Sequence, residues 1–228
     1  MDPSHDGPPS ADTASGTAAD DQHRPPVADA TLVRAGDTDF DAFYTTTPPW
    51  DIGRPQPALS DLARTGAIVG RVLDAGCGTG EHALMAADLG LEATGVDIAA
   101  TAIAQAQRKA RERSLTARFV VGDARHLGTL GGHFDTVLDS GLLHVFEDED
   151  RARYVDALGT VVPPGGRLYL LCFNEHVPGD TGPRRVTQDE IRSSFRHGWR
   201  VAAIEPARIV ATFNADGVPA WCATIHRT

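Results

Sequence analysis

The sequence has few cysteines and no long hydrophobic run. Cys77, Cys172 and Cys222 form no Cys-x-x-Cys pair and no ligand-like cluster with histidine, so the sequence predicts neither a disulfide framework nor a metal site. It contains no apolar stretch of roughly eighteen residues or more, the length that a membrane-spanning helix needs. The N-terminus also lacks the basic and apolar regions of a secretory signal. We therefore expect a soluble, cytoplasmic protein with no membrane partner.

Basic residues are also scarce. The chain has 21 lysines and arginines against 31 aspartates and glutamates, which gives a formal net charge of -10. Nine of the acids lie in residues 1–41 beside only Arg24 and Arg34, a local charge of -7 that leaves -3 for the rest. Neutralising phosphates supplies most non-specific affinity for nucleic acid, so a chain without a basic stripe is a poor nucleic-acid binder. A small-molecule acceptor is the expected partner.

Large apolar side chains are almost absent from residues 1–30, which are rich in Asp, Pro, Ala, Ser, Thr and Gly. Such a segment cannot offset the entropy that it would lose on ordering, so we expect a disordered acidic tail there. With 228 residues and 41% hydrophobic composition, the chain is long enough for one α/β domain, which we place at residues 31–228.

From residue 71 onward, short buried strands alternate with helices. The expected strands are 71–75, 91–96, 119–121, 134–138, 167–173, 201–204 and 221–225, and the expected helices are 81–89, 99–113, 147–162 and 187–195. Gly90 ends the first of these helices, a capping box of Thr187 and Glu190 opens the last, and Asp216-Gly217 forms the turn before the final strand. This alternation predicts an α/β fold with a parallel sheet and helices on both faces. Ligands in such sheets bind outside the carboxyl ends of the strands.

A glycine-rich turn follows the first expected strand. Asp74-Ala75-Gly76-Cys77-Gly78-Thr79-Gly80 lies where glycine lets the backbone turn sharply and lets a ligand approach closely. The glycines run G-x-G-x-G, unlike the G-x-G-x-x-G of dinucleotide-binding folds. Glu81 begins the helix that would hold a pyrophosphate, and its charge opposes such a ligand. The turn therefore favours a nucleoside-type cofactor other than NAD.

Acidic residues also follow three later strands. Asp97 lies where a carboxylate accepts both hydroxyls of a ribose. Asp123 is placed to accept a hydrogen bond from an adenine amino group, and Asp139-Ser140 reaches the middle of the crevice. Together with Asp74, these acids suit a ligand that carries sulfonium and ammonium groups. The alternative is that each aspartate only caps a helix or a turn.

Four segments resemble the motifs of the class I S-adenosylmethionine-dependent methyltransferases: VLDAGCGTGEHAL, GVDI, VGDA and FDTVLDSGLLHVF. Bacterial small-molecule enzymes related to thiopurine methyltransferase and to heterocyclic-toxin methyltransferases are similar in PPWDIGRPQPAL, DSGLLHVFEDEDRARY, PPGGRLYLLCF and GPRRVTQDEI. The resemblance runs from about Phe40 to the C-terminus. It implies a Rossmann-like, seven-stranded, mostly parallel sheet with an antiparallel last strand, and an N-terminal helical cover at residues 31–68 over the active site.

The resemblance also assigns site residues. It implies cofactor contacts at Trp50, Asp74, Ala75, Gly76, Cys77, Gly78, Thr79, Gly80, Asp97, Ile98, Asp123, Ala124, Asp139 and Ser140. Trp50 would lie near the sulfonium, whose charge an indole face stabilises, with plain packing as the alternative. The expected acceptor-side residues are Tyr44, Asp51, Arg54, His144, His176 and Arg184. His144 is the candidate for orienting or deprotonating the acceptor, and a histidine satisfied inside its own loop is the alternative.

The expected activity is transfer of a methyl group from S-adenosylmethionine to an O, N or S atom of a small aromatic or heterocyclic molecule, a secondary metabolite or toxin. Such a displacement needs aligned reactants and no metal. Thr47-Pro48-Pro49-Trp50 resembles the motif of nucleic-acid amino methyltransferases, but that motif should follow a strand at the crevice, where this chain has Asp139-Ser140-Gly141. A protein that binds S-adenosylmethionine without catalysis is a further alternative.

Overall fold

A computed structural model describes residues 39–179 and 182–228. The expected acidic tail, residues 1–30, lies outside these residues, and so do residues 31–38 of the expected cover. The strands are β1 (Arg71–Ala75), β2 (Glu92–Asp97), β3 (Ala117–Val121), β4 (Thr136–Ser140), β5 (Arg167–Phe173), β6 (Trp199–Ala211) and β7 (Asn214–Arg227). The helices are α1 (Phe40–Phe43), α2 (Pro57–Arg64), α3 (Glu81–Asp88), α4 (Ala100–Glu112), α5 (Asp148–Val161) and α6 (Gln188–Ser194), with 3-10 helices η1 (Ala124–Leu130) and η2 (Leu143–Val145).

The seven strands form one sheet in the order β3-β2-β1-β4-β5-β7-β6. β1 to β5 pair in parallel, and β7 runs antiparallel to both of its neighbours, β5 and β6. The mostly parallel sheet with an antiparallel last strand is therefore confirmed. The strand order reverses at β1 and β4, and in open α/β sheets the crevice at such a switch point is where ligands bind.

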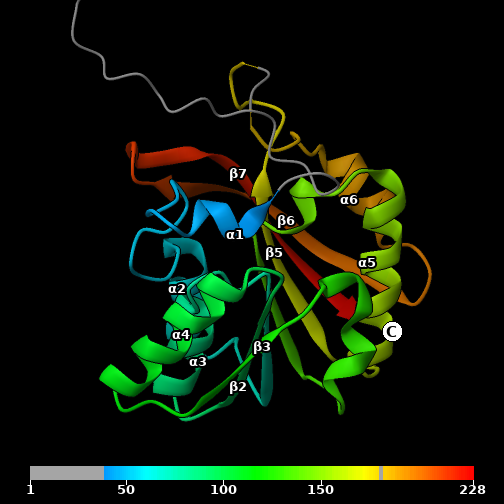
Figure 1. Ribbon diagram of the computed structural model, residues 1–228. Coiled ribbons are helices and arrows are strands. Elements are labelled where there is room, and N and C mark those ends of the chain that lie inside the picture. The colour runs from blue at the N-terminus through cyan, green and yellow to red at the C-terminus, as the bar shows by residue number, and fades with distance from the viewer. Residues whose placement is uncertain (1–38, 180–181) are drawn as a thin grey trace, which may run out of the picture. The chain divides into compact units, whose positions relative to one another are not determined.

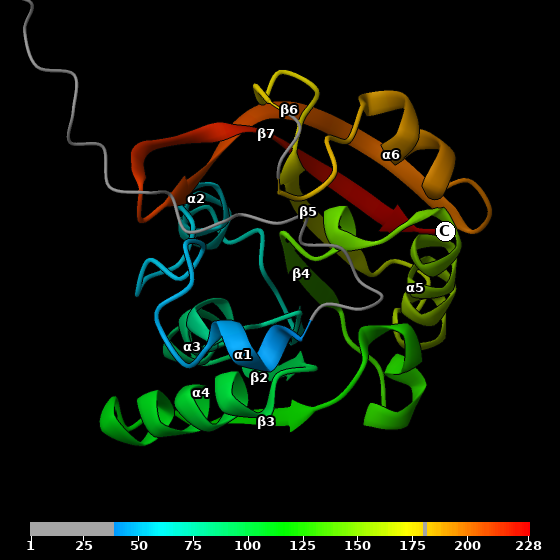
Figure 2. The ribbon, with the colours of Figure 1, turned by 45° about the horizontal axis from the view of Figure 1, so that its top comes forward.

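Helices cover both faces of this sheet (Figure 1), as the alternating pattern predicts. α2, α3 and α4 lie on one side, and α5 and α6 lie on the other. α4 turns Ala102, Ile103 and Ala106 inward at helical spacing, and α5 buries Tyr154 and Leu158 in the same way. The short helix α1 packs beside α4 (Figure 2).

The hairpin of β6 and β7 is longer than the sequence predicts. The two strands contain 13 and 14 residues, and the chain reverses at Thr212-Phe213, so the predicted turn at Asp216-Gly217 is wrong. These two residues lie inside β7 opposite a register shift between Ile209 and Ala211, and Gly217 has a φ of +79°, as in a β-bulge. The tip of the hairpin contacts the chain between α1 and α2, where the Thr212 N–H donates to the Pro49 carbonyl at 2.8 Å.

Candidate functional site

The glycine-rich turn lies between β1 and α3, at the carboxyl edge of the sheet. Gly76, Gly78 and Gly80 have φ values of +67°, +52° and +87°, in the left-handed region that favours glycine. A Cβ on Gly78 would lie 2.8 Å from the Tyr44 hydroxyl, and one on Gly80 would lie 2.7 Å from the Phe119 ring. The turn therefore needs glycine for its backbone conformation and for the close approach of its neighbours.

Asp97 ties this turn to the end of β2. Its Oδ2 accepts from the Gly78 N–H at 2.7 Å, and its Oδ1 accepts from the Ala99 N–H at 2.9 Å. The side chain is 9% exposed, and burial raises its pKa in spite of these hydrogen bonds. A carboxylate oxygen can accept two hydrogen bonds, so the Asp97 side chain retains capacity for the ribose hydroxyls that we expect there.

Two exposed apolar side chains flank Asp97. Ile98 is 54% exposed, and Val121, the last residue of β3, is 53% exposed. The register of β2 and β3 pairs Asp97 with Val121, which places both apolar groups at one edge of the sheet. Apolar surface at a strand end suits packing against a flat ring. Val121 is not among the cofactor contacts expected from the sequence, although its position at the end of a strand next to Asp97 could have suggested it.

Asp123 is engaged by its neighbour Arg125. Its carboxylate accepts from the Arg125 guanidinium at 2.7 to 3.0 Å and from the Arg125 backbone N–H at 2.8 Å. Partial burial opposes ionisation, but these hydrogen bonds lower the pKa of Asp123. Its side chain therefore caps η1, which is the alternative that the sequence left open, while Ala124 beside it is buried.

The other two acids at strand ends face the protein interior. Asp74 is 1% exposed and accepts from the Ala83 N–H at 3.0 Å. Asp139 is fully buried and accepts from the Leu142 N–H at 2.9 Å and the Tyr154 hydroxyl at 3.0 Å. Their hydrogen bonds agree with the alternative that these aspartates cap the backbone after a strand. They hold the backbone that follows β1 and β4.

These buried acids predict how stability depends on pH. Burial raises the pKa of Asp74 and of Asp139 to about 7. In an unfolded chain they titrate near about 4, so between these values the folded protein binds more protons and its stability falls as the pH rises. Asp139→Asn, which keeps an acceptor oxygen, should therefore reduce the loss of unfolding free energy between pH 5 and pH 8 by about 2 kcal/mol. Urea denaturation at both pH values measures this loss.

The control for that experiment is Asp216→Asn, which neutralises an exposed carboxylate. It should leave the loss of unfolding free energy as large as in the wild-type protein. A loss in Asp139→Asn as steep as that of the control would show that Asp139 is already ionised in the folded protein below neutral pH.

Residues 39–56, which we call the cover segment, pack on the glycine-rich turn. The Trp50 Nε1–H donates to the Tyr44 hydroxyl at 3.1 Å, and the rings of Phe43 and Trp50 lie 5.3 Å apart. Tyr44 is 6% exposed, and burial and the charge of Asp97 raise its pKa. Tyr44 thus lies beside the expected cofactor contacts Gly78 and Asp97.

Two further residues of the cover segment are expected on the acceptor side. Asp51 accepts from the hydroxyl of Thr79 in the glycine-rich turn at 2.7 Å, so its carboxylate contacts the turn and not the acceptor side. Arg54 is exposed, and within residues 39–179 and 182–228 its side chain has no hydrogen bond or ion pair. The structure therefore gives no support to an acceptor contact by either residue.

His144, in η2 after β4, is 5% exposed. Its Nδ1 accepts from the Phe173 N–H at 3.0 Å. Burial, together with the charges of Arg151 and Arg185, lowers its pKa to about 3. The ring is therefore neutral with its proton on Nε2, and the lone pair of Nδ1 is already used. This geometry favours the alternative of a histidine satisfied inside its loop over a role as general base.

The loop after β5 is anchored by Arg184, whose guanidinium binds Asp148 of α5 and Glu190 of α6. Because both partners lie on helices, Arg184 ties the loop to α5 and α6. His176 is exposed in the same loop, with its ring 6.2 Å from that of Trp221. His176 keeps its place as an acceptor-side candidate, and Ser140, half-buried at the end of β4, stays a candidate cofactor contact.

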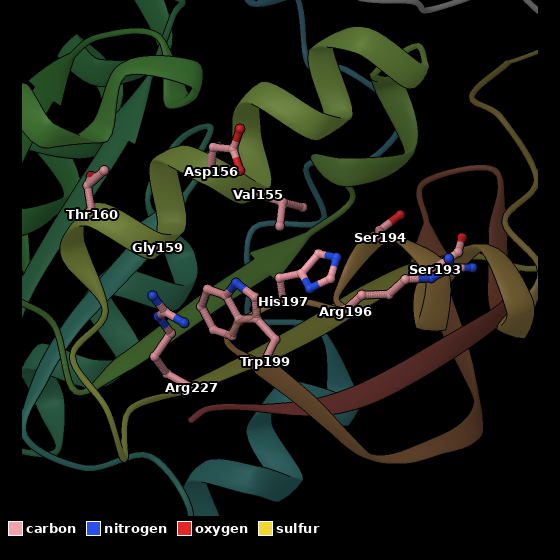
Figure 3. Close-up of a pocket in the computed structure, with 10 residues that line it drawn as sticks. All are labelled: Val155, Asp156, Gly159, Thr160, Ser193, Ser194, Arg196, His197, Trp199 and Arg227. Atoms are coloured by element: carbon pink, nitrogen blue, oxygen red, sulfur yellow. The ribbon is translucent and has the colours of Figure 1, made fainter.

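A hollow of about 570 Å³ lies away from this edge, between α5, α6 and the start of β6. Figure 3 shows Asp156 of α5 on one side of it and Trp199 and Arg227 on the other, with the guanidinium 5.2 Å from the indole centre. The glycine-rich turn lines no part of this hollow. In the described part of the chain, no group of His, Cys, Asp and Glu is arranged to hold a metal ion, and no helix is long and apolar enough to cross a membrane.

The turn, Asp97 and the cover segment meet at the carboxyl edge of the sheet. Residues 72–166 match the model of a methyltransferase domain. A 2-heptyl-1-hydroxyquinolin-4(1H)-one methyltransferase of Mycobacteroides abscessus is 39% identical over 173 residues, which is 75% of each chain. The chain belongs to the class I S-adenosylmethionine-dependent methyltransferases. Its cofactor is S-adenosylmethionine, as the sequence predicts, and the Asp97 carboxylate beside the turn has the acceptor chemistry that the ribose hydroxyls of that molecule require.

Solved structures share this methyltransferase fold. A structure reported for the conversion of a disulfide bond into a thioacetal group during echinomycin biosynthesis has a TM-score of 0.75 and 37% identity, with 82% of this chain and 91% of that chain covered. Magnesium protoporphyrin IX methyltransferase from Synechocystis PCC 6803 with bound S-adenosylmethionine has a TM-score of 0.59 at 22% identity, with 84% and 86% covered. The relatives named for a reaction thus include small-molecule methyltransferases.

Proposed function

We propose that this methyltransferase transfers a methyl group from S-adenosylmethionine to an O, N or S atom of a small aromatic or heterocyclic molecule. We place it with the bacterial enzymes related to thiopurine methyltransferase and the heterocyclic-toxin methyltransferases. The observation that carries the proposal is 39% identity, across three quarters of both chains, to a methyltransferase named for a hydroxyquinolinone. The aromatic pair of Phe43 and Trp50 next to the cofactor-binding turn supports a flat apolar acceptor.

S-adenosylmethionine supplies a methyl group activated by a sulfonium, and the chain supplies binding and alignment. Asp97 and the backbone of Gly78 hold the adenosyl side, with Ile98 and Val121 as apolar walls. The cover segment excludes water, and alignment of the acceptor atom at about 3 Å from the methyl carbon provides the rate gain. His144 takes no proton in this scheme, because its Nδ1 holds the backbone at the end of β5.

The nucleic-acid alternative has little support from the site. Thr47-Pro48-Pro49-Trp50 lies in the cover segment before β1, while β4 ends in Asp139-Ser140. The motif of the amino methyltransferases would have to follow β4 to reach a flipped base at the crevice. A small-molecule acceptor needs no such placement.

The experiment is incubation of the protein with labelled S-adenosylmethionine and a panel of phenols, thiols and N-hydroxy heterocycles, 1-hydroxyquinolin-4-ones among them. Mass spectrometry should find an acceptor that has gained one methyl group, with one equivalent of S-adenosylhomocysteine formed. Tight cofactor binding without transfer to any member of the panel would contradict the proposal and favour non-catalytic binding. Transfer to DNA or RNA in a parallel reaction would favour the nucleic-acid alternative.

A further inference from the structure

The hydroxyl of Thr79, in the glycine-rich turn, links Asp51 of the cover segment to Lys109 of α4. The Thr79 hydroxyl donates to Asp51 Oδ2 at 2.7 Å and accepts from Lys109 Nζ at 2.6 Å. Thr79 is 4% exposed, and the side chains of Lys109 and Asp51 are 18% and 13% exposed, so water competes weakly for these contacts. Asp51 belongs to the cover segment, Thr79 to the turn and Lys109 to α4, so the three residues join three separate parts of the site.

A buried carboxylate holds the lysine in place. Glu81 is 7% exposed, accepts from Lys109 Nζ at 2.8 Å, and accepts from the Arg113 guanidinium on both oxygens at 2.8 Å. Burial opposes its ionisation, but Arg113 and Lys109 lower the pKa of Glu81. The lysine ammonium lies 3.9 Å from Asp51 Oδ2 as well, so it is shared between two carboxylates. At the start of α3, Glu81 therefore fixes the position of the Lys109 ammonium group.

The two ends of the cover segment are held by other contacts. Asp41 accepts from the backbone N–H and the hydroxyl of Thr101 at 2.7 and 2.9 Å. The amide of Gln56 pairs with both backbone groups of Val210, at 2.8 and 2.9 Å. The backbone between the two ends is also held, by the Thr212 N–H on the Pro49 carbonyl at 2.8 Å and the Gln105 amide on the Tyr44 carbonyl at 3.0 Å. Loss of the Asp51 contact would therefore loosen the segment next to Trp50 without detaching it.

We propose that Asp51, Thr79 and Lys109 form a latch that holds the middle of the cover segment over the bound cofactor, with Lys109 as a positioning residue. The latch keeps Trp50 and Tyr44 against the turn, so the cofactor is enclosed while the latch is closed. Its effect on turnover rests on the proposed function. Its effect on cofactor binding does not, because binding needs no acceptor.

The test is calorimetric titration of Lys109→Met, Asp51→Ala and the double variant with S-adenosylhomocysteine. Each single change should raise Kd at least tenfold, and the double change should raise it no further than the stronger single change, because the two hydrogen bonds meet at the Thr79 hydroxyl and act as one unit. Arg108→Met is the matched control, since Arg108 lies one residue earlier on α4, is 58% exposed and pairs with Glu112 on the same helix. It should bind with wild-type affinity.

A second pair of variants covers the case in which a charge change prevents folding. Thr79→Val keeps the shape and should lose affinity as Lys109→Met does, whereas Thr79→Ser keeps the hydroxyl and should bind S-adenosylhomocysteine more tightly than Thr79→Val. Hydrogen exchange of residues 45–53 should rise in Thr79→Val and not in Thr79→Ser. Unchanged Kd in Lys109→Met or Thr79→Val, or fully additive effects of the two single changes, would overturn the latch. Absence of methyl transfer with every acceptor would leave these binding results intact and would overturn only the proposed function.

Discussion

Asp97→Ala is expected to weaken the binding of S-adenosylmethionine at least tenfold, about 1.4 kcal/mol. The carboxylate holds the cofactor-binding turn through the Gly78 N–H at 2.7 Å, and it retains capacity for the ribose hydroxyls. Alanine removes both interactions and leaves the Gly78 N–H without its acceptor inside a buried turn, which is costly in itself. Calorimetric titration with S-adenosylmethionine measures the loss.

The two roles of Asp97 are separated by changing the ligand as well as the protein. A 2′-deoxy analogue of S-adenosylhomocysteine should bind the wild-type protein more weakly than S-adenosylhomocysteine does. In Asp97→Ala the two ligands should bind alike, because the hydroxyl no longer has its partner. If the analogue loses as much affinity in the variant as in the wild type, Asp97 does not bind the ribose and acts on the turn alone.

The core of the fold could be predicted because its signals are local. Strands and helices between residues 71 and 173 follow from short apolar runs and helical spacing, and their observed ends lie within two residues of the predicted ones. The capping box is confirmed, with the Thr187 N–H donating to Glu190 at 2.8 Å, and Gly90 ends α3 with a φ of +78°. Each of these signals depends on residues a few positions apart, so the sequence carries them in full.

The hairpin turn could not be predicted in the same way. Asp216-Gly217 is a real turn signal, but the register of the long strands places it in a bulge. The side chain of Arg208, on the partner strand, donates to the carbonyls of both residues and holds them there. Pairing between strands therefore decides whether a local signal becomes a turn or a bulge.

Contacts between residues distant in sequence also decide which side chains of the candidate site are free to bind a ligand. The sequence predicts which acids reach the carboxyl edge of the sheet, but not which donors compete for them. Asp139 turns inward because the Tyr154 hydroxyl, fifteen residues later in the chain, donates to it. The Nδ1 of His144 is used by the N–H of Phe173, twenty-nine residues on. Such partners come together only in the folded chain, so the sequence alone could not show that the Asp139 carboxylate and the His144 Nδ1 already have hydrogen-bond donors.

Gly80→Ala is expected to lower the free energy of unfolding by about 3 kcal/mol, from left-handed backbone strain and from crowding in the core. Gly80 has a φ of +87°, and an added Cβ would lie 2.7 Å from the Phe119 ring and 2.8 Å from the Ala106 methyl group. Both neighbours are buried, so neither can move away cheaply. Urea denaturation measures the change, and the same variant should bind S-adenosylmethionine more weakly because the turn must shift.

Gly90→Ala separates the two causes, since Gly90 lies past the other end of α3 with a φ of +78° and open space around its Cβ position. It should cost about 1 kcal/mol, the strain of the backbone alone. The larger loss of unfolding free energy in Gly80→Ala than in Gly90→Ala then measures the crowding. Adding Phe119→Leu to Gly80→Ala should recover part of this loss, because it shortens the side chain that the new methyl group meets. Equal losses in the two alanine variants would mean that the turn moves freely away from Phe119. In that case the packing around Gly80 does not fix the shape of the cofactor-binding turn, and its hydrogen bond to Asp97 has to do so.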